Sequence, residues 1–136
     1  MKLPAELEAL RQFHGHLGPF VVAGYVAGAL ALEELGARRY FGMKVELHCP
    51  PQPPPSCLAD GIQFSTGCTL GKRNIALEAS DSVLIACQNT DDGRRLSLRL
   101  PDQTRDAFGE WIRELGEEQA SLRVWQAGRE LFEVGA

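Results

Sequence analysis

The sequence predicts one domain of the α+β class, because a group of strand-forming segments lies between helical segments in the chain. Beyond residue 72, three short runs rich in aliphatic residues are separated by turn-forming residues, which is typical of an antiparallel meander. Before and after these runs, apolar residues recur at the helical period of about 3.6 residues. The chain has 136 residues, which is within the usual size of a single domain. We therefore expect one domain over residues 1–136, without a linker.

The N-terminal quarter is expected to form two helices. Leucines at helical spacing predict a short helix over residues 4–11, which ends near Phe13. Pro19 suits the first turn of a second helix, and Gly36 is a suitable C-cap for it. Small residues recur along one side of this helix and would allow another backbone to approach closely: Gly24, Ala27, Gly28 and Ala31.

The middle of the chain combines a strand, a proline-rich segment and a helix. Residues 43–47 alternate like a short strand, and residues 50–55 contain five prolines, a stiff extended segment that cannot lie inside a sheet. Ser56 is a capping residue for a helix over residues 57–65, and Gly67 is a plausible end of it.

Three strands and two helices are expected in the rest of the chain. The strands cover residues 74–79, 82–88 and 96–100, and the middle one is apolar throughout, so it should lie centrally in the sheet. Cys87 on this strand is the best candidate for a purely structural cysteine. Helices are expected over residues 102–115 and 117–132, separated at Gly116.

Charge and composition exclude several classes of function. The net charge is −4, with eleven Arg and three Lys, so no basic surface is expected to attract nucleic acid or an anionic membrane. The N-terminus lacks the apolar core of a signal peptide, and the most apolar stretch, residues 19–32, is too short to span a bilayer. We therefore expect a cytoplasmic protein. Cysteines stay reduced there, so four of them beside three histidines indicate ligands or catalytic thiols, although free cysteine is also a common core residue.

Two histidines lie one residue apart, at His14 and His16. On a helix their side chains would point about 200° apart, whereas on an extended segment they would share a side. Gly15 favours the extended or irregular form, in which both rings face one site near the start of the helix at Pro19. The N-terminus of that helix would favour an anionic ligand. The alternative is that one ring only forms a hydrogen bond at the helix entry.

Cys57 and Asp60 are three residues apart and would share one face of a helix. At the first turn, the unpaired N–H groups would lower the thiol pKa of Cys57, which favours a thiolate that binds metal or attacks an electrophile. Asp60 could also simply complement the helix dipole. Cys68 would lie about 16 Å further along a continuous helix, so both thiols could not bind one ion. If the helix ends near Gly67, Cys68 lies on a returning loop that approaches a cleft or a neighbouring subunit.

The segment 67–72 has some features of a phosphate-binding loop, but its glycine spacing is one residue too short and Arg73 stands where Ser or Thr is needed. Nucleotide hydrolysis is therefore excluded. The free N–H groups around Thr69 could still form a nest for an anion near Lys72, and the alternative is a tight turn. His48 and Cys49 form a further pair whose side chains face opposite ways on a strand.

Two segments, FHGHLGPF and CLADGIQFSTGCTLGKRNIAL, resemble the FmdE family, proteins similar to the FmdE component of formylmethanofuran dehydrogenase. The resemblance covers roughly residues 10–90. It implies an α+β domain with helices packed on a mixed, largely antiparallel sheet of about four strands, usually assembled as a homodimer. It also implies a metal site, commonly assigned as zinc or another divalent transition metal. By position, the implied ligands are His14, His16 and Cys57, and the family's other polar positions correspond to Asp60, Cys68, Thr69 and Lys72.

The sequence departs from the family pattern in three places. Members often show HGHxCP, whereas Gly18 stands where that cysteine would be. The segment HCPPQPPPS is enlarged, and it either supplies His48 or Cys49 as a replacement ligand or reshapes the entrance. Longer relatives carry a C-terminal cysteine-rich module like a zinc ribbon, and we expect a short form without it.

Three hypotheses about function follow. The first is a cytoplasmic, dimeric metal-binding protein with an open coordination position for a small molecule, acting as an accessory protein or a small metalloenzyme. The second is a metal-independent thiol or redox enzyme that uses Cys57, with His16 as base. The third is a non-catalytic interaction subunit. The cysteine runs of iron–sulfur clusters are not present, so the chain is not itself the dehydrogenase. The candidate catalytic residues are Cys57, Asp60 and Lys72, and no substrate is assigned.

Overall fold

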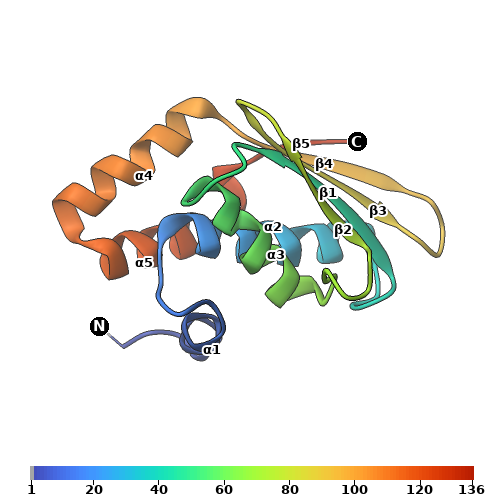
Figure 1. Ribbon diagram of the computed structural model, residues 1–136, viewed down its shortest axis with the longest axis horizontal. Coiled ribbons are helices and arrows are strands. Elements are labelled where there is room, and N and C mark those ends of the chain that lie inside the picture. The colour runs from blue at the N-terminus through green and yellow to red at the C-terminus, as the bar shows by residue number, and fades with distance from the viewer. Residues whose placement is uncertain (1) are drawn as a thin grey trace.

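The computed structural model describes residues 2–136 and shows a layer of helices against one face of a five-stranded sheet (Figure 1). The strands are β1 (Met43–Cys49), β2 (Ile75–Ala79), β3 (Val83–Asn89), β4 (Arg95–Leu100) and β5 (Glu133–Gly135). The helices are α1 (Ala5–His14), α2 (Pro19–Leu35), α3 (Leu58–Thr66), α4 (Asp102–Leu115) and α5 (Glu117–Ala127), with the short 3-10 helices η1 (Pro55–Cys57) and η2 (Gly128–Leu131). The α+β class is therefore confirmed.

Helix α2 is the central element of the helical layer. It is apolar on nearly all sides, as expected of a helix surrounded by other elements. Its small-residue stripe lies against α3, where a Cβ on Gly24 would be only 2.1 Å from the carbonyl oxygen of Leu58. Reciprocally, a Cβ on Gly61 of α3 would be 2.0 Å from the carbonyl oxygen of Val21. The two helices are thus in backbone contact, and Figure 1 shows them side by side beneath the sheet.

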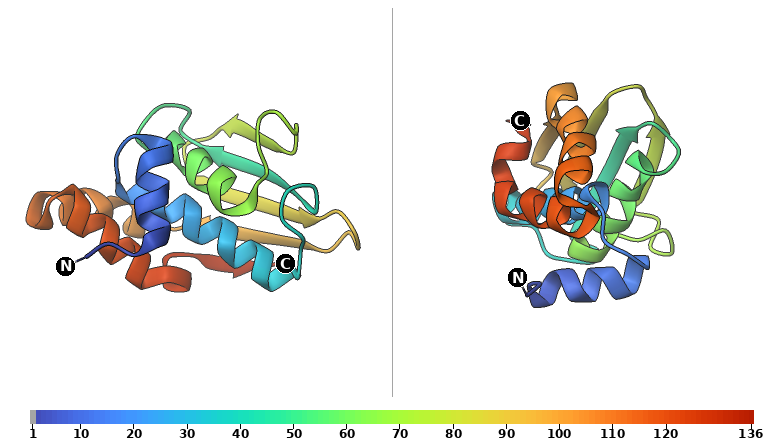
Figure 2. Two further views of the ribbon diagram at one scale, coloured as in Figure 1. Left: turned by 90° about the horizontal axis from the view of Figure 1, so that it is seen from below. Right: turned by 90° about the vertical axis from the view of Figure 1, so that its left-hand side faces the viewer.

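The sheet is covered on one face only. Along β1 and β3 the residues alternate between buried and more exposed positions, and the buried set includes Val45, Leu47 and Ile85. This alternation is typical of a sheet that packs on a core with one face and meets solvent with the other. The two views in Figure 2 show the helices gathered on the covered face.

The strand order is β2-β1-β3-β4-β5, which corrects the predicted meander. Strand β2 does not pair with β3; it pairs in parallel with β1, from Val45 opposite Ile75 to Cys49 opposite Ala79. The reason is the helix α3, which lies between β1 and β2 in the chain and provides the crossover that a parallel pair requires. The remaining pairs, β1–β3, β3–β4 and β4–β5, are antiparallel, and of these only β3–β4 belongs to the predicted meander.

The C-terminal helix is shorter than predicted. Helix α5 ends at Ala127, because Gly128 adopts a positive φ of 55° and breaks the helix. After η2, residues Glu133–Gly135 form the fifth strand beside β4. The sequence predicted about four strands and a helix to residue 132, so β5 is an addition to the expected fold.

No single helix within residues 2–136 has the length and hydropathy needed to cross a bilayer. Helices α1 and α2 reach those values only when they are taken together, and they are bent by 119° at the connection between them.

Candidate functional site

The two histidines lie at the connection between α1 and α2. His14 is the last residue of α1, and Gly15 caps the helix in the left-handed region with a φ of 104°. The chain turns there, and the rings of His14 and His16 come to rest with centroids 4.8 Å apart. The expectation that both histidines lie outside a helix is wrong for His14. The expectation that Gly15 allows the rings to meet is confirmed.

His14 has one ring nitrogen bound and one free. Its Nδ1 lies 2.6 Å from Oδ2 of Asp60, which belongs to the first turn of α3. A carboxylate can only accept a hydrogen bond, so Nδ1 donates, and in the neutral ring Nε2 keeps its lone pair. The His14 side chain is only 8% exposed, and Nε2 is buried without a hydrogen-bond partner among residues 2–136. Buried polar atoms are almost always satisfied, so this nitrogen is positioned for a ligand.

Cys57 and Asp60 stand at the same end of α3, where Cys57 is the N-cap residue. Burial raises the pKa of the half-buried Cys57 thiol, and the negative charge of Asp60 raises it further. The predicted lowering by the helix N-terminus is therefore wrong, because desolvation and the nearby carboxylate have the larger effect. Near neutral pH this thiol is protonated unless a cation stabilises the thiolate.

This pKa gives a first testable expectation for Cys57. In metal-free protein, Cys57 should react with a disulfide reagent more slowly near neutral pH than an unperturbed cysteine, and its rate should still be rising above pH 9. Cys57 should nevertheless react first, because the other three cysteines are buried. The pH dependence of the rate, compared between the wild type and Cys57→Ser, measures this. A rate above that of a free thiol at pH 7 would contradict it.

A carboxylate that the sequence patterns did not identify borders the histidine loop. Gly18, the N-cap of α2, is extended, with φ −151° and ψ 163°. A Cβ at this position would lie 3.8 Å from His16 Nε2 and also 3.8 Å from Glu117 Oε2. Glu117 is the first residue of α5 and is about a hundred positions away in the chain, so no local spacing connects it with the histidines.

Cys68 does not belong to this site. It is fully buried just beyond the C-terminal end of α3, and its thiol lies 3.2 Å from the carbonyl oxygen of Met43. The expectation that it lies on the loop after Gly67 is confirmed, and the expectation that it faces a cleft or another protomer is wrong, because the side chain is buried. Helix α3 separates it from Asp60 by most of the helix length, about 12 Å at 1.5 Å per residue.

The loop after Cys68 is a tight turn and not an anion nest. The backbone N–H groups of Thr69 and Leu70 donate to side chains, to Asn74 Oδ1 at 2.9 Å and to Gln63 Oε1 at 3.0 Å. The N–H of Lys72 faces the Thr69 hydroxyl at 3.3 Å. The N–H groups of Thr69, Leu70 and Lys72 are thus occupied, which argues against the anion-binding interpretation of Thr69 and Lys72.

His48 and Cys49 are neighbours on β1 and lie on opposite faces of the sheet. His48 Nε2 lies 2.8 Å from Glu46 Oε1 on the open face of the sheet. Cys49 is fully buried on the opposite face, and burial raises the pKa of its thiol. Cys87 is buried as predicted, and burial raises its pKa to about 12.

Across residues 2–136, no three His, Cys, Asp or Glu side chains converge closely enough, as they stand, to hold one metal ion. The arrangement still fits such an ion in one respect, because it provides a buried imidazole nitrogen without a partner, oriented by a carboxylate. His16 and Glu117 are exposed, so their side chains are free to adopt other rotamers.

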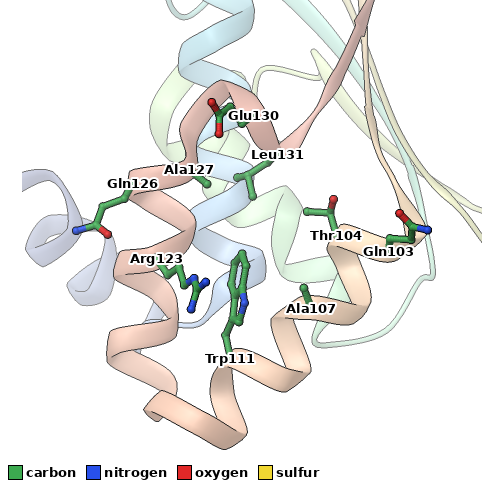
Figure 3. Close-up of a pocket in the computed structure, with 9 residues that line it drawn as sticks. All are labelled: Gln103, Thr104, Ala107, Trp111, Arg123, Gln126, Ala127, Glu130 and Leu131. Carbon is green, nitrogen blue, oxygen red and sulfur yellow. The ribbon is translucent and has the colours of Figure 1, made fainter.

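A cavity of about 520 Å³ lies elsewhere, between α4, α5 and η2 (Figure 3). The guanidinium of Arg123 stands 4.7 Å over the ring of Trp111 at its wall. None of the site residues predicted from the sequence lines this cavity, whose wall is formed by Gln103, Thr104, Ala107, Trp111, Arg123, Gln126, Ala127, Glu130 and Leu131.

Comparisons with known proteins agree with this fold. The family described as "FmdE, Molybdenum formylmethanofuran dehydrogenase operon" matches residues 13–133. A "Probable S-adenosyl-L-methionine-binding protein" of Archaeoglobus fulgidus is 35% identical over 80 residues, which cover 54% of this chain and 20% of that protein. The chain thus spans about a fifth of that relative's length.

A solved structure shares the fold over most of the chain. It is the crystal structure of a tungsten formylmethanofuran dehydrogenase FmdE-like protein from Syntrophus aciditrophicus, with a TM-score of 0.64 and 22% sequence identity. The similarity covers 95% of this chain and 68% of that one. At this identity the similarity shows a common fold.

Proposed function

The chain belongs to the FmdE family, and from this membership we propose that it is a metal-binding protein whose ligands are His14, His16 and Cys57. The observation that carries the proposal is the state of His14, whose buried Nε2 has no partner in the described residues while Asp60 holds Nδ1. Histidines that bind metal almost always donate their other ring N–H to a carboxylate, a carbonyl or water. Asp60 is then a positioning residue, which fixes the tautomer and direction of the ring.

The other two ligands fit this role for different reasons. The His16 ring already lies beside His14 and is exposed, so it can turn its Nε2 toward a shared ion. Cys57 shares the first turn of α3 with Asp60, and metal binding would stabilise the thiolate that burial otherwise disfavours. Two imidazoles and one thiolate are a ligand set for zinc, and iron, nickel or copper are also compatible with it.

When bound, such an ion with three protein ligands keeps a position for water or for a donor atom of a small molecule. The exposed His16 side of the site leaves room for that molecule. The proposal includes a cytoplasmic protein that assembles as a homodimer, the assembly that the family resemblance implies. The small molecule is proposed only by class, as one that presents a group able to coordinate the metal.

Metal analysis of protein prepared without a histidine tag tests this function. Wild-type protein loaded with zinc or cobalt and then desalted should retain about one ion per chain. His48→Ala is the control for substitutions of the proposed ligands, because His48 pairs with Glu46 away from the site. This variant should retain as much metal as the wild type. Wild-type protein without stoichiometric metal after loading with zinc, cobalt, iron, nickel and copper would exclude the proposal.

The role of Asp60 gives a second prediction. Asp60→Asn should weaken zinc affinity by about 10- to 100-fold, because the amide holds the His14 ring less firmly and lowers its basicity. Asp106→Asn, an exposed change on α4, is the control and should bind like the wild type. Competition with a chromophoric chelator measures both. An Asp60→Asn affinity equal to that of the wild type would show that Asp60 does not orient a ligand.

The thiol-enzyme alternative is less well supported. Its nucleophile would be Cys57, whose pKa is raised by burial and by Asp60, in the opposite direction to that of an activated thiol.

A further inference from the structure

The backbone at Gly18 leaves a small space between two polar groups. Its extended φ of −151° is accessible to any residue, so the conformation does not require glycine. The nearest atoms to an added Cβ are His16 Nε2 and Glu117 Oε2, both at 3.8 Å. The imidazole and the carboxylate therefore lie on the border of one space, no more than about 7.6 Å from each other.

The position of Glu117 is fixed by the fold. Gly116, with a φ of 83°, ends α4 and reverses the chain, so that α5 begins at Glu117. Helix α5 packs on α2 through its buried side, and the rings of Tyr25 and Trp125 are 5.5 Å apart in this contact. The backbone of α5 is thus held against the helix that begins at the histidine loop, whereas the Glu117 side chain is exposed.

Glu117 is an acidic residue in the first turn of α5, a position that the helix dipole favours. None of the ion pairs found within residues 2–136 involves its carboxylate. The group that it faces across the space at Gly18 is the His16 ring. A second, independent observation points to a ligand at the same loop, namely the buried His14 Nε2 beside the His16 ring.

We infer that Glu117 supplies an oxygen ligand that completes the metal site formed by His14, His16 and Cys57. This inference rests on the proposed function. A carboxylate oxygen and an imidazole nitrogen bind zinc at about 2.0–2.2 Å, and rotation of the exposed His16 and Glu117 side chains closes the space between them. Glu117 and the Cys57 thiolate together carry two negative charges, which balance a divalent cation. The donor set is then two nitrogens, one sulfur and one oxygen, so a small molecule would bind the ion by displacing Glu117 or as a fifth ligand.

The test compares zinc affinities of the wild type, Glu117→Gln and Glu118→Gln by competition with a chelator. Glu118 is the matched control, because it is the next residue of α5, also exposed. Glu117→Gln should bind zinc at least about tenfold more weakly, and Glu118→Gln should bind like the wild type. Both substitutions are at exposed positions, so thermal unfolding of the metal-free proteins should coincide.

A rescue variant tests whether a donor atom placed in this space binds the ion. Gly18→Cys in the Glu117→Gln background places a thiol between the same two groups, in a space where the nearest atoms are 3.8 Å from its Cβ. It should restore zinc affinity, and the cobalt-loaded variant should gain intensity in the thiolate-to-cobalt charge-transfer band. Failure to restore the affinity would overturn the inference.

The outcomes distinguish this inference from the proposed function. If the wild type binds metal and Glu117→Gln binds it equally well, Glu117 is not a ligand and the proposed function stands. If the wild type binds no metal, the proposed function fails, and the assignment of Glu117 fails with it.

Discussion

Replacing His14 by alanine is expected to reduce zinc affinity by more than about a hundredfold, so that desalted protein retains no stoichiometric metal. Changes to groups that only orient a ligand already cost about 10- to 100-fold, and this change removes the ligand itself. The His14 side chain is 8% exposed and its free Nε2 is buried. Metal analysis and chelator competition on the same preparation measure the loss.

The variant must be shown to fold. His14→Ala removes the hydrogen-bond partner of Asp60, whose side chain is 42% exposed and can bind water instead, so the cost is about 1 kcal/mol, less than the stability of an ordinary domain. His14→Asn is a second variant, whose amide nitrogen occupies the position of Nδ1 and can still donate to Asp60 but which has no imidazole. Both should lose metal while circular dichroism remains that of the wild type. Stoichiometric, wild-type-like zinc binding by folded His14→Ala would contradict the assignment of His14.

Replacing Gly61 by alanine is expected to lower the free energy of unfolding by about 3 kcal/mol or more. The added Cβ would lie 2.0 Å from the carbonyl oxygen of Val21 and 2.5 Å from the backbone nitrogen of Tyr25. Both are backbone atoms of α2, so a side-chain rotation cannot relieve the overlap, and the two helices must move apart. Because Asp60 and Cys57 belong to the same end of α3, this displacement should weaken metal binding as well.

Urea unfolding of the metal-free proteins measures the loss of stability. Gly71→Ala is the control, because a Cβ at Gly71 meets nothing within 4 Å, and its effect should stay within about 0.5 kcal/mol. A Gly61→Ala midpoint equal to that of the wild type would show that α2 and α3 are not in backbone contact.

The helices of this fold could be predicted from local patterns, whereas the strand order could not. The stripe containing Gly24 and Gly28 indicated a close helix contact, and α3 is the helix that fills it. The pattern of β2 is the same for a parallel or an antiparallel partner, so only the position of α3 in the chain identifies the crossover to β1. Strand β5 has three residues, too few for an alternating pattern to be recognised.

The candidate site was predictable where its residues are neighbours in the sequence. His14 and His16 share a loop, and Cys57 and Asp60 share a helical turn, so their spacing carried the prediction. The hydrogen bond between His14 and Asp60 joins residues 46 positions apart, and Glu117 reaches the same loop from α5. Such contacts depend on how the helices pack, which residue spacing does not specify.

The buried partners of Cys68 and Thr69 explain why those candidates were overestimated. The Cys68 thiol is occupied by the Met43 carbonyl, and the Thr69 N–H by Asn74. Each partner comes from a different element or from beyond the turn. The sequence therefore identifies the reactive groups but does not show which of them already have hydrogen-bond partners.

Anomalous scattering from crystals of zinc-loaded, untagged protein is the most direct measurement of the proposed metal centre. The predicted result is one anomalous peak at about 2.0–2.1 Å from His14 Nε2, with Asp60 still bound to Nδ1 and the His16 ring turned toward the ion. A peak bound to other residues, or a zinc-loaded protein in which His14 Nε2 contacts no metal, would contradict it.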